Sequence, residues 1–344
     1  MDLSWTVALA GLLVGFVVGL TGMGGGALMT PMMILLFGIQ PLAAVSSDLV
    51  ASMVMKPIGG AVHLRRGTVN KTLVKWLVIG SVPSAFCGVL LLRAIGDDEA
   101  TQAVVKTSLG IALLLAAASM VAKALIDLRK TQLARAAGIV DLSPGDGTDV
   151  HIRPVPTLLV GIVGGLVVGM TSVGSGSLMI VALLMLYPTL RARQLVGTDL
   201  VQAVPLVASA SLGHLLFGDF QLDLTISLLV GAIPGVYVGA RVSTAAPGGI
   251  VRRALVVVLL ASGLKLLEAT TGVLVAVLGA VAVVGPLLWA TVYRSARPDG
   301  TRHGIGPLFR AAVTGRLHRH PATPSDPENT PATVTSRDDS DVSR

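Results

Sequence analysis

Long apolar runs separated by short polar stretches fill most of this sequence. A helix needs about 20 mostly apolar residues to cross a bilayer. Charged residues make up only 13% of the chain, about half their usual share in soluble proteins. We therefore predict an all-α, polytopic integral membrane protein embedded in a lipid bilayer, and we exclude a soluble enzyme, a nucleic-acid-binding domain and a β-barrel porin. The runs are 4–37, 43–62, 72–92, 102–126, 155–187, 196–217, 222–240, 250–267 and 272–293.

Two of these runs, 4–37 and 155–187, are too long for one straight helix. At 1.5 Å per residue each would extend about 50 Å, far more than a bilayer core. Each contains a patch of small residues near its middle, at 21–26 and 171–176. A glycine weakens a helix by about 1 kcal/mol relative to alanine. We predict that both runs break there and turn back as a hairpin of two short helices.

The two patches belong to an internal repeat. At an offset of 150 residues, segment 11–29 matches segment 161–179 in most of its glycines, including Gly24 and Gly26 of the first patch. At an offset of 151, Asp48-Leu49-Val50 meets Asp199-Leu200-Val201. So many matched residues at nearly one offset predict a duplication of the transmembrane unit.

The positions of Lys and Arg predict that the two repeats are inverted. Arg65 and Arg66 follow the 43–62 run, whereas Asp219, with no nearby Lys or Arg, follows the matched 196–217 run. Lys and Arg concentrate on the cytoplasmic side of a membrane. The flipped bias therefore favours two inverted-topology repeats, each opening with a Gly-broken helical hairpin, and an external N-terminus.

Composition divides the chain into four parts. The C-terminal segment is rich in Pro, Thr, Ser, Asp and Arg and has few apolar residues, which is typical of disorder. We expect a first transmembrane repeat (1–126), a polar cytoplasmic linker (127–154), a second transmembrane repeat plus an extra final helix (155–294) and a disordered cytoplasmic tail (295–344). The single cysteine, Cys87, cannot form an intrachain disulfide.

The small-residue patches are the predicted substrate site. Unwound backbone and helix N-termini offer N–H groups and partial positive charge, which together bind an anion. Broken helices of inverted-repeat transporters carry such sites near the membrane midplane. The alternative is a tight helix crossing packed by small residues. The candidate substrate-binding residues in the patches are Thr21, Gly22, Gly24, Gly25, Gly26, Thr171, Ser172, Gly174, Ser175 and Gly176.

Three charged residues within the apolar runs are candidate functional residues. Asp48 and Asp199 occupy matched positions and either cap a helix N-terminus or tune charge and carry a coupling ion, because a carboxylate at membrane depth is costly. Lys56 follows Asp48 by eight residues and shares its helical face. It contacts the anionic substrate, pairs with Asp48 or extends to the interface, and the sequence leaves these alternatives open.

Matched histidines and prolines complete the candidate set. His63 and His214 close their runs near the membrane interface, either as hydrogen-bonded structural residues or as a proton relay. Pro83 and Pro234 are predicted kinks that serve as hinges.

No motif in the sequence supports enzyme chemistry. There is no nucleotide-binding G-x-x-x-x-G-K-[ST] motif, no set of catalytic residues and no cluster of metal ligands. We therefore expect no catalytic residue, metal or cofactor.

The order of these motifs resembles the TauE/SafE family, the sulfite exporters and four-toluene-sulfonate uptake permeases. The resemblance covers about residues 5 to 270 and departs from the family in the linker, the final run and the tail. It implies a multi-pass inner-membrane permease for small anions, mainly sulfur oxyanions and sulfonates, with both exporters and importers among its members. The residues that carry it are Gly15, Gly19, Gly22, Gly24, Gly25, Gly26, Pro31, Ser47, Asp48, His63, Arg65, Arg66, Gly67, Gly174 and Gly176.

We therefore predict a permease that moves sulfite, a sulfonate or a related organic anion across the bacterial cytoplasmic membrane. Alternating access would be coupled to a proton or sodium gradient. The alternatives are an anion channel and a non-transporting scaffold or accessory subunit. The expected partners are the anion, the coupling ion and lipid, with no nucleic acid; the sequence leaves open whether the protein is a homo-oligomer.

Overall fold

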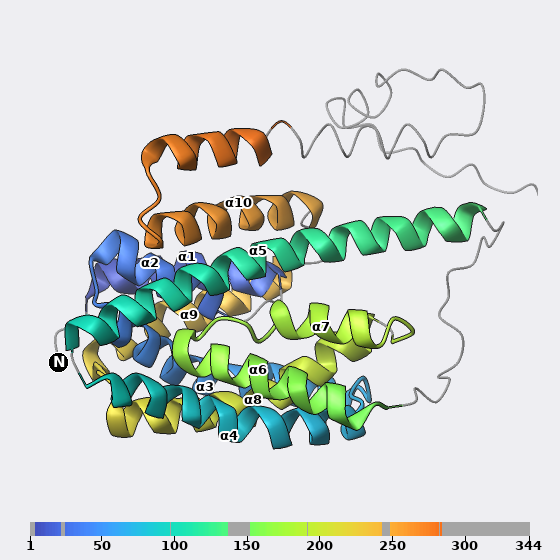
Figure 1. Ribbon diagram of the computed structural model, residues 1–344, viewed down its shortest axis with the longest axis horizontal. Coiled ribbons are helices and arrows are strands. Elements are labelled where there is room, and N and C mark those ends of the chain that lie inside the picture. The colour runs from blue at the N-terminus through green and yellow to red at the C-terminus, as the bar shows by residue number, and fades with distance from the viewer. Residues whose placement is uncertain are drawn as a thin grey trace, which may run out of the picture. The chain divides into compact units, whose positions relative to one another are not determined.

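The computed structural model describes residues 4–21, 25–96, 98–136, 152–190, 192–242, 248–281 and 283. The chain divides into two units, Met1–Arg294 and Ser295–Arg344. The second unit, which holds the tail expected to be disordered, lies outside the described residues. The described part of the first unit is helical and contains no strand (Figure 1).

Apolar helices account for nearly all of the described residues. They are α1 (Trp5–Thr21), α2 (Gly26–Phe37), α3 (Pro41–Arg65), α4 (Lys71–Ile95), α5 (Asp98–Ala136), α6 (Pro154–Thr171), α7 (Leu178–Leu186), α8 (Ala192–Phe217), α9 (Leu222–Val242), α10 (Gly248–Leu266) and a following helix, Thr271–Val281. Within the described ranges, α3, α4, α5, α6, α8 and α9 are long and apolar enough to cross a membrane. The prediction of an all-α, multi-span fold is confirmed.

Both over-long apolar runs are interrupted at their small-residue patches, as predicted. Helix α1 ends at Thr21 and α2 begins at Gly26, while α6 ends at Thr171 and α7 begins at Leu178. The second break has a clear backbone cause, because Ser172, Gly174 and Gly176 all have positive φ, at 60°, 129° and 99°. Glycine reaches such angles without the steric cost that other residues carry.

Helix α5 is longer than the sequence analysis predicted. The apolar run ends at 126, and residues 127–154 were expected to form a polar linker, but α5 continues to Ala136. Residues 127–136 are rich in Leu, Arg, Lys, Gln and Ala, which are strong helix formers. Helix propensity therefore extends the helix beyond its apolar part, and residues 137–151 lie outside the described residues.

Two helix pairs pack closely through glycine, and in both pairs the helices run parallel. In α4 and α6, Leu77 faces Gly161 and Ala85 faces Gly169, so both helices advance in the same direction. A Cβ atom at either glycine would overlap the backbone of the facing helix. Figure 1 shows α4 and α6 side by side.

The pair α1 and α9 repeats this arrangement. Ala8 faces Gly231 and Phe16 faces Gly239, again in parallel register and again too close for a Cβ atom. The first helix of each repeat, α1 or α6, therefore packs on a helix of the other repeat, α9 or α4. Small residues that let backbones approach closely are a common device in membrane helix packing.

Two other pairs, α3 with α8 and α5 with α10, run antiparallel. Ser46 near the start of α3 contacts His214 near the end of α8, while His63 near the end of α3 lies against Gly197 near the start of α8. Likewise, Lys106 near the start of α5 binds Glu268, which lies just after the end of α10. The members of each pair occupy equivalent positions in the internal repeat.

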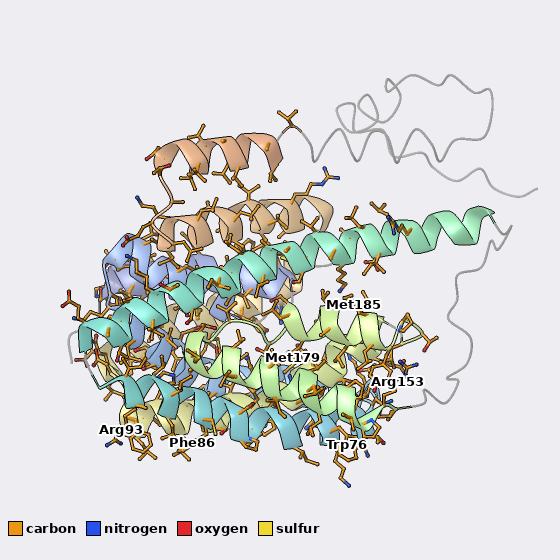
Figure 2. All side chains as sticks on the ribbon, viewed as in Figure 1. Trp76, Phe86, Arg93, Arg153, Met179 and Met185 are labelled. Atoms are coloured by element: carbon orange, nitrogen blue, oxygen red, sulfur yellow. The ribbon has the colours of Figure 1, made fainter. Side chains whose placement is uncertain are left out.

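Aromatic and basic side chains gather at the helix ends. The Arg93 guanidinium lies over the ring of Phe217 at 4.3 Å from its centroid, and Phe86 meets the same ring edge-on. Figure 2 shows Arg93 and Phe86 near one end of α4, with Trp76 near the other. Aromatic rings and long basic side chains are typical of the membrane–water interface.

Candidate functional site

Asp48 lies fully buried in α3. Its Oδ2 atom accepts two hydrogen bonds, from the Thr30 hydroxyl of α2 at 2.8 Å and from the Ser172 hydroxyl at 2.7 Å. Its Oδ1 atom is buried and has no hydrogen-bond partner within the described part of the chain. Asp48 thus joins α2, α3 and the break between α6 and α7, and it retains one unused acceptor.

Lys56 is also buried, with 9% of its surface exposed. Its Nζ atom donates to the Ser175 hydroxyl at 2.6 Å. It interacts electrostatically with both Asp199 and Asp48, but among the described residues it forms no ion pair with either. The ammonium group therefore interacts electrostatically with two carboxylates while it bonds to the interrupted segment.

Asp199 is the equivalent acid in α8 and is 2% exposed. Its Oδ1 atom accepts a hydrogen bond from the Gln202 side-chain amide at 3.1 Å, and the backbone of Gly176 supplies a further hydrogen bond. The Gln202 amide oxygen in turn accepts from the Ser81 hydroxyl of α4 at 3.3 Å. This second acid is therefore held by amide donors.

The interrupted segment 172–176 is the point where these three charged residues meet. Ser172 donates to Asp48, Ser175 accepts from Lys56 and Gly176 bonds to Asp199. The backbone N–H groups of Ser175 and of Ser177, the N-cap of α7, have no acceptor among the described residues. Unpaired N–H groups beside a buried ammonium can bind an anion.

The two small-residue patches touch each other. Gly26 lies against the backbone and hydroxyl of Ser172, and a Cβ atom at Gly26 would overlap the Ser172 carbonyl oxygen. Gly25 precedes α2 as its N-cap residue. Gly22 and Gly24 lie outside the described residues, and the side chain of Thr21 is likewise not described.

Thr171 and Gly174 serve the local backbone. The Thr171 hydroxyl donates to the Val167 carbonyl oxygen at 2.6 Å and accepts from the Val173 N–H. Gly174 supplies the carbonyl oxygen that accepts the first N–H of α7, from Leu178. These contacts end one helix and begin the next.

The capping interpretation of the two acids is wrong. Helix α3 begins at Pro41 and α8 begins at Ala192, so Asp48 and Asp199 both lie about two turns inside their helices. A capping residue precedes the first turn. The helices begin before the apolar runs, because residues 41–42 and 192–195 also adopt helical structure.

The two histidines differ in exposure. His214 is fully buried, where its Nδ1 atom bonds the Ser46 hydroxyl and its Nε2 atom bonds the Gly169 carbonyl oxygen, each at 2.8 Å. The carbonyl can only accept, so Nε2 carries the proton and Nδ1 accepts from Ser46. His63 is partly exposed and bonds the Thr68 hydroxyl at 2.9 Å. The two matched histidines therefore differ in burial, and their position at the membrane interface stays a prediction.

Pro83 and Pro234 lie inside α4 and α9. Their role as hinges stays a prediction.

Sequence analysis missed four residues around the buried acids. Thr30, Ser46, Ser81 and Gln202 are polar side chains buried within apolar stretches. Their position within apolar stretches is the sequence signal that could have found them, since a polar group at membrane depth needs a partner. Gln202 binds Asp199 three residues earlier in α8, a helical spacing that the sequence contains. The partners of Thr30, Ser46 and Ser81 lie on other helices, so the sequence alone did not indicate which groups these three meet.

This arrangement defines a multi-span helical membrane protein with a buried polar centre. The sulfite exporter TauE/SafE family matches residues 7–266. The chain belongs to this family, whose members are membrane transporters and not enzymes.

Three relatives from Bacillus subtilis (strain 168) support this assignment. The probable membrane transporter protein YjnA is 38% identical over 266 residues, covering 77% of this chain and 100% of the relative. The probable membrane transporter protein YdhB is 25% identical, covering 74% of this chain and 96% of the relative. YunE, also named a probable membrane transporter protein, is 38% identical over 93 residues, covering 27% of this chain and 32% of the relative. No solved structure gives a significant match.

Proposed function

We propose that this transporter moves a small anion, such as sulfite or a sulfonate, across the cytoplasmic membrane by ion-coupled alternating access. The family description, sulfite exporter, supports a sulfur oxyanion as the substrate class. The observation that carries the proposal is the Lys56 ammonium, buried and bonded to Ser175 beside unpaired backbone N–H groups. A buried lysine without a paired carboxylate is costly, and a binding site for an anion offsets that cost.

The helix directions support two inverted repeats. Equivalent helices α3 and α8 run antiparallel, and so do α5 and α10. A two-fold axis in the membrane plane produces this relation, because it turns each helix end over end. The same axis exchanges the parallel pair α1 and α9 with the parallel pair α6 and α4.

In this proposal the anion binds at the two breaks, where the halves meet. Ser172, Ser175 and Gly176 would supply hydroxyl and backbone donors, with Gly25 and Gly26 facing them from the first half. Lys56 would supply the countercharge. The hinges at Pro83 and Pro234 would let the glycine-packed helix pairs move against the rest of the protein.

The test is anion flux in proteoliposomes that contain the full chain. Sulfite, thiosulfate, sulfate, taurine and sulfoacetate would each be offered with and without a pH or sodium gradient. We expect saturable, gradient-driven flux of at least one of them. Flux that does not saturate would instead indicate a channel, and no flux from correctly inserted protein would favour a scaffold.

A matched pair of glycine variants links the flux to the site. Gly176 has a φ of 99°, so Gly176→Ala strains the break, and we expect at least a tenfold loss of flux for about 1.4 kcal/mol of strain. Gly59 in α3 has only a leucine side chain near its Cβ position, at 3.9 Å, so Gly59→Ala should keep full flux. Equal flux in the two variants would contradict a role for the break.

A further inference from the structure

The hydroxyl of Ser172 is already bound to an anion within the protein. It donates its hydrogen bond to Asp48 Oδ2 at 2.7 Å. A hydroxyl has a single O–H donor. While Asp48 accepts that bond, Ser172 cannot donate to a substrate anion, so the carboxylate and the substrate compete for the same donor.

The buried charges oppose anion binding in the same way. With all three groups ionised, Asp48 and Asp199 contribute two negative charges and Lys56 one positive charge, a net charge of −1. An arriving anion adds further negative charge to a poorly solvated region, which is strongly unfavourable. One proton bound at the same time keeps the buried charge unchanged for a monovalent anion.

Asp48 has a free position for that proton. Its Oδ1 atom is buried and has no partner among the described residues, whereas Oδ2 accepts both hydroxyl bonds. A proton needs one lone pair. A metal cation needs several oxygen ligands at once, and here it would also meet the positive charge of Lys56.

The charged and titratable groups around Asp48 are few. Lys56 lies on the same helix and interacts with it directly. Asp199 lies on α8, and His214 on α8 bonds Ser46, two residues before Asp48. Helix α2 contributes only the Thr30 hydroxyl, and α5 and α9 place no described charged group in interaction with Asp48.

We propose that Asp48 acts as an internal anion that a proton displaces: protonation at Oδ1 releases the Ser172 hydroxyl to the substrate, so that each anion binds together with a proton. The proton comes from water on the open side and returns to water when the anion leaves, and no other bond forms or breaks. The inference rests on the proposed function and names its coupling ion. Sodium coupling is the competing outcome.

The experiment measures proton uptake during anion binding. Purified full-length protein in weakly buffered detergent solution, with a pH indicator, is mixed with ethanesulfonate or thiosulfate, which stay ionised near neutral pH. Binding is measured in parallel by calorimetry. For the monovalent ethanesulfonate we expect uptake of about one proton per bound anion, and an affinity that falls about tenfold per pH unit once Asp48 is ionised.

Two variants separate the role of Asp48 from a structural one. Asp48→Asn has nearly the same shape and is neutral, like the protonated acid, so it should bind the anion without proton uptake and with an affinity independent of pH. Ser47→Ala is the matched control, because Ser47 is a buried neighbour whose hydroxyl has no partner in the described region. It should keep the wild-type proton uptake and pH dependence.

Each result decides the matter. Anion binding by the wild-type protein without proton uptake overturns this inference, as does proton uptake that persists in Asp48→Asn or anion binding that requires sodium. These results leave anion transport intact. If neither probe binds and no anion shows flux, the proposed function fails and this inference fails with it. If Asp48→Asn does not insert, the wild-type uptake measurement still decides.

Discussion

The two halves of the protein place the same acid at the same position but surround it differently. Asp48 in the first half accepts hydrogen bonds from the hydroxyl groups of Thr30 and Ser172. Asp199 in the second half accepts them from the amide of Gln202 and the backbone of Gly176. The repeat therefore preserves the carboxylate and changes the chemistry of its donors.

The type of donor determines how each acid responds to a proton. A hydroxyl can rotate and become an acceptor, so Thr30 and Ser172 can adapt to a protonated Asp48. An amide N–H can only donate, so Gln202 favours the ionised form of Asp199. The first half thus carries the more adaptable acid and the second half the more fixed one.

The halves also differ in their buried cation. Lys56 of α3 corresponds to Val207 of α8 at the repeat offset. Both acids interact electrostatically with this lysine, in addition to their hydrogen bonds. The lysine is therefore the residue at which the symmetry of the charged centre is broken.

The largest expected effect comes from removing that lysine. Lys56→Met leaves two buried carboxylates without a cation, a change that costs about 3–5 kcal/mol when buried pairs are broken in soluble proteins. We expect a clear fall in the unfolding temperature in detergent, partly restored by adding Asp199→Asn. Lys71→Met is the control, because Lys71 is exposed at the start of α4. An unchanged unfolding temperature for Lys56→Met would show that the carboxylates do not depend on it.

A smaller loss of stability is expected when the hydroxyl partner of a histidine is removed, and it should be larger for His214 than for His63. Ser46→Ala removes the donor to buried His214, which should lower the stability by about 1 kcal/mol. Thr68→Ala removes the hydroxyl that bonds the His63 ring, but water can replace it because His63 is partly exposed. The two variants would be compared by thermal unfolding in one detergent. A larger loss for Thr68→Ala would contradict the difference in burial.

The smallest effect is expected at the ion pair between Lys106 and Glu268, where the atoms lie 2.6 Å apart. The hydrogen bond from Lys106 lowers the pKa of the exposed Glu268 carboxyl. A lowered pKa means that any stabilisation is present above the usual glutamate pKa and is lost as the pH falls through the folded value. Glu268→Gln should therefore match the wild-type unfolding temperature at acidic pH and differ from it only slightly at neutral pH. A difference in unfolding temperature that grows as the pH falls would contradict the expected pH dependence of this ion pair.

The sequence alone predicted the helical membrane fold and the positions of both helix breaks. These features depend on local properties: the length of apolar runs, and glycines that destabilise a helix at 21–26 and 171–176. The helix limits were less accurate where polar helix formers continued a helix, as at the end of α5 and the start of α8.

Only the tertiary structure decided which polar groups meet. Ser172 binds Asp48 across 124 residues of sequence, and Ser46 binds His214 across 168. Such contacts depend on which helices pack together and in which direction, which no local pattern contains. The sequence alone therefore specified the buried acids, the lysine and the broken helices, while the packing of α3, α8 and the break before α7 joined them into one centre.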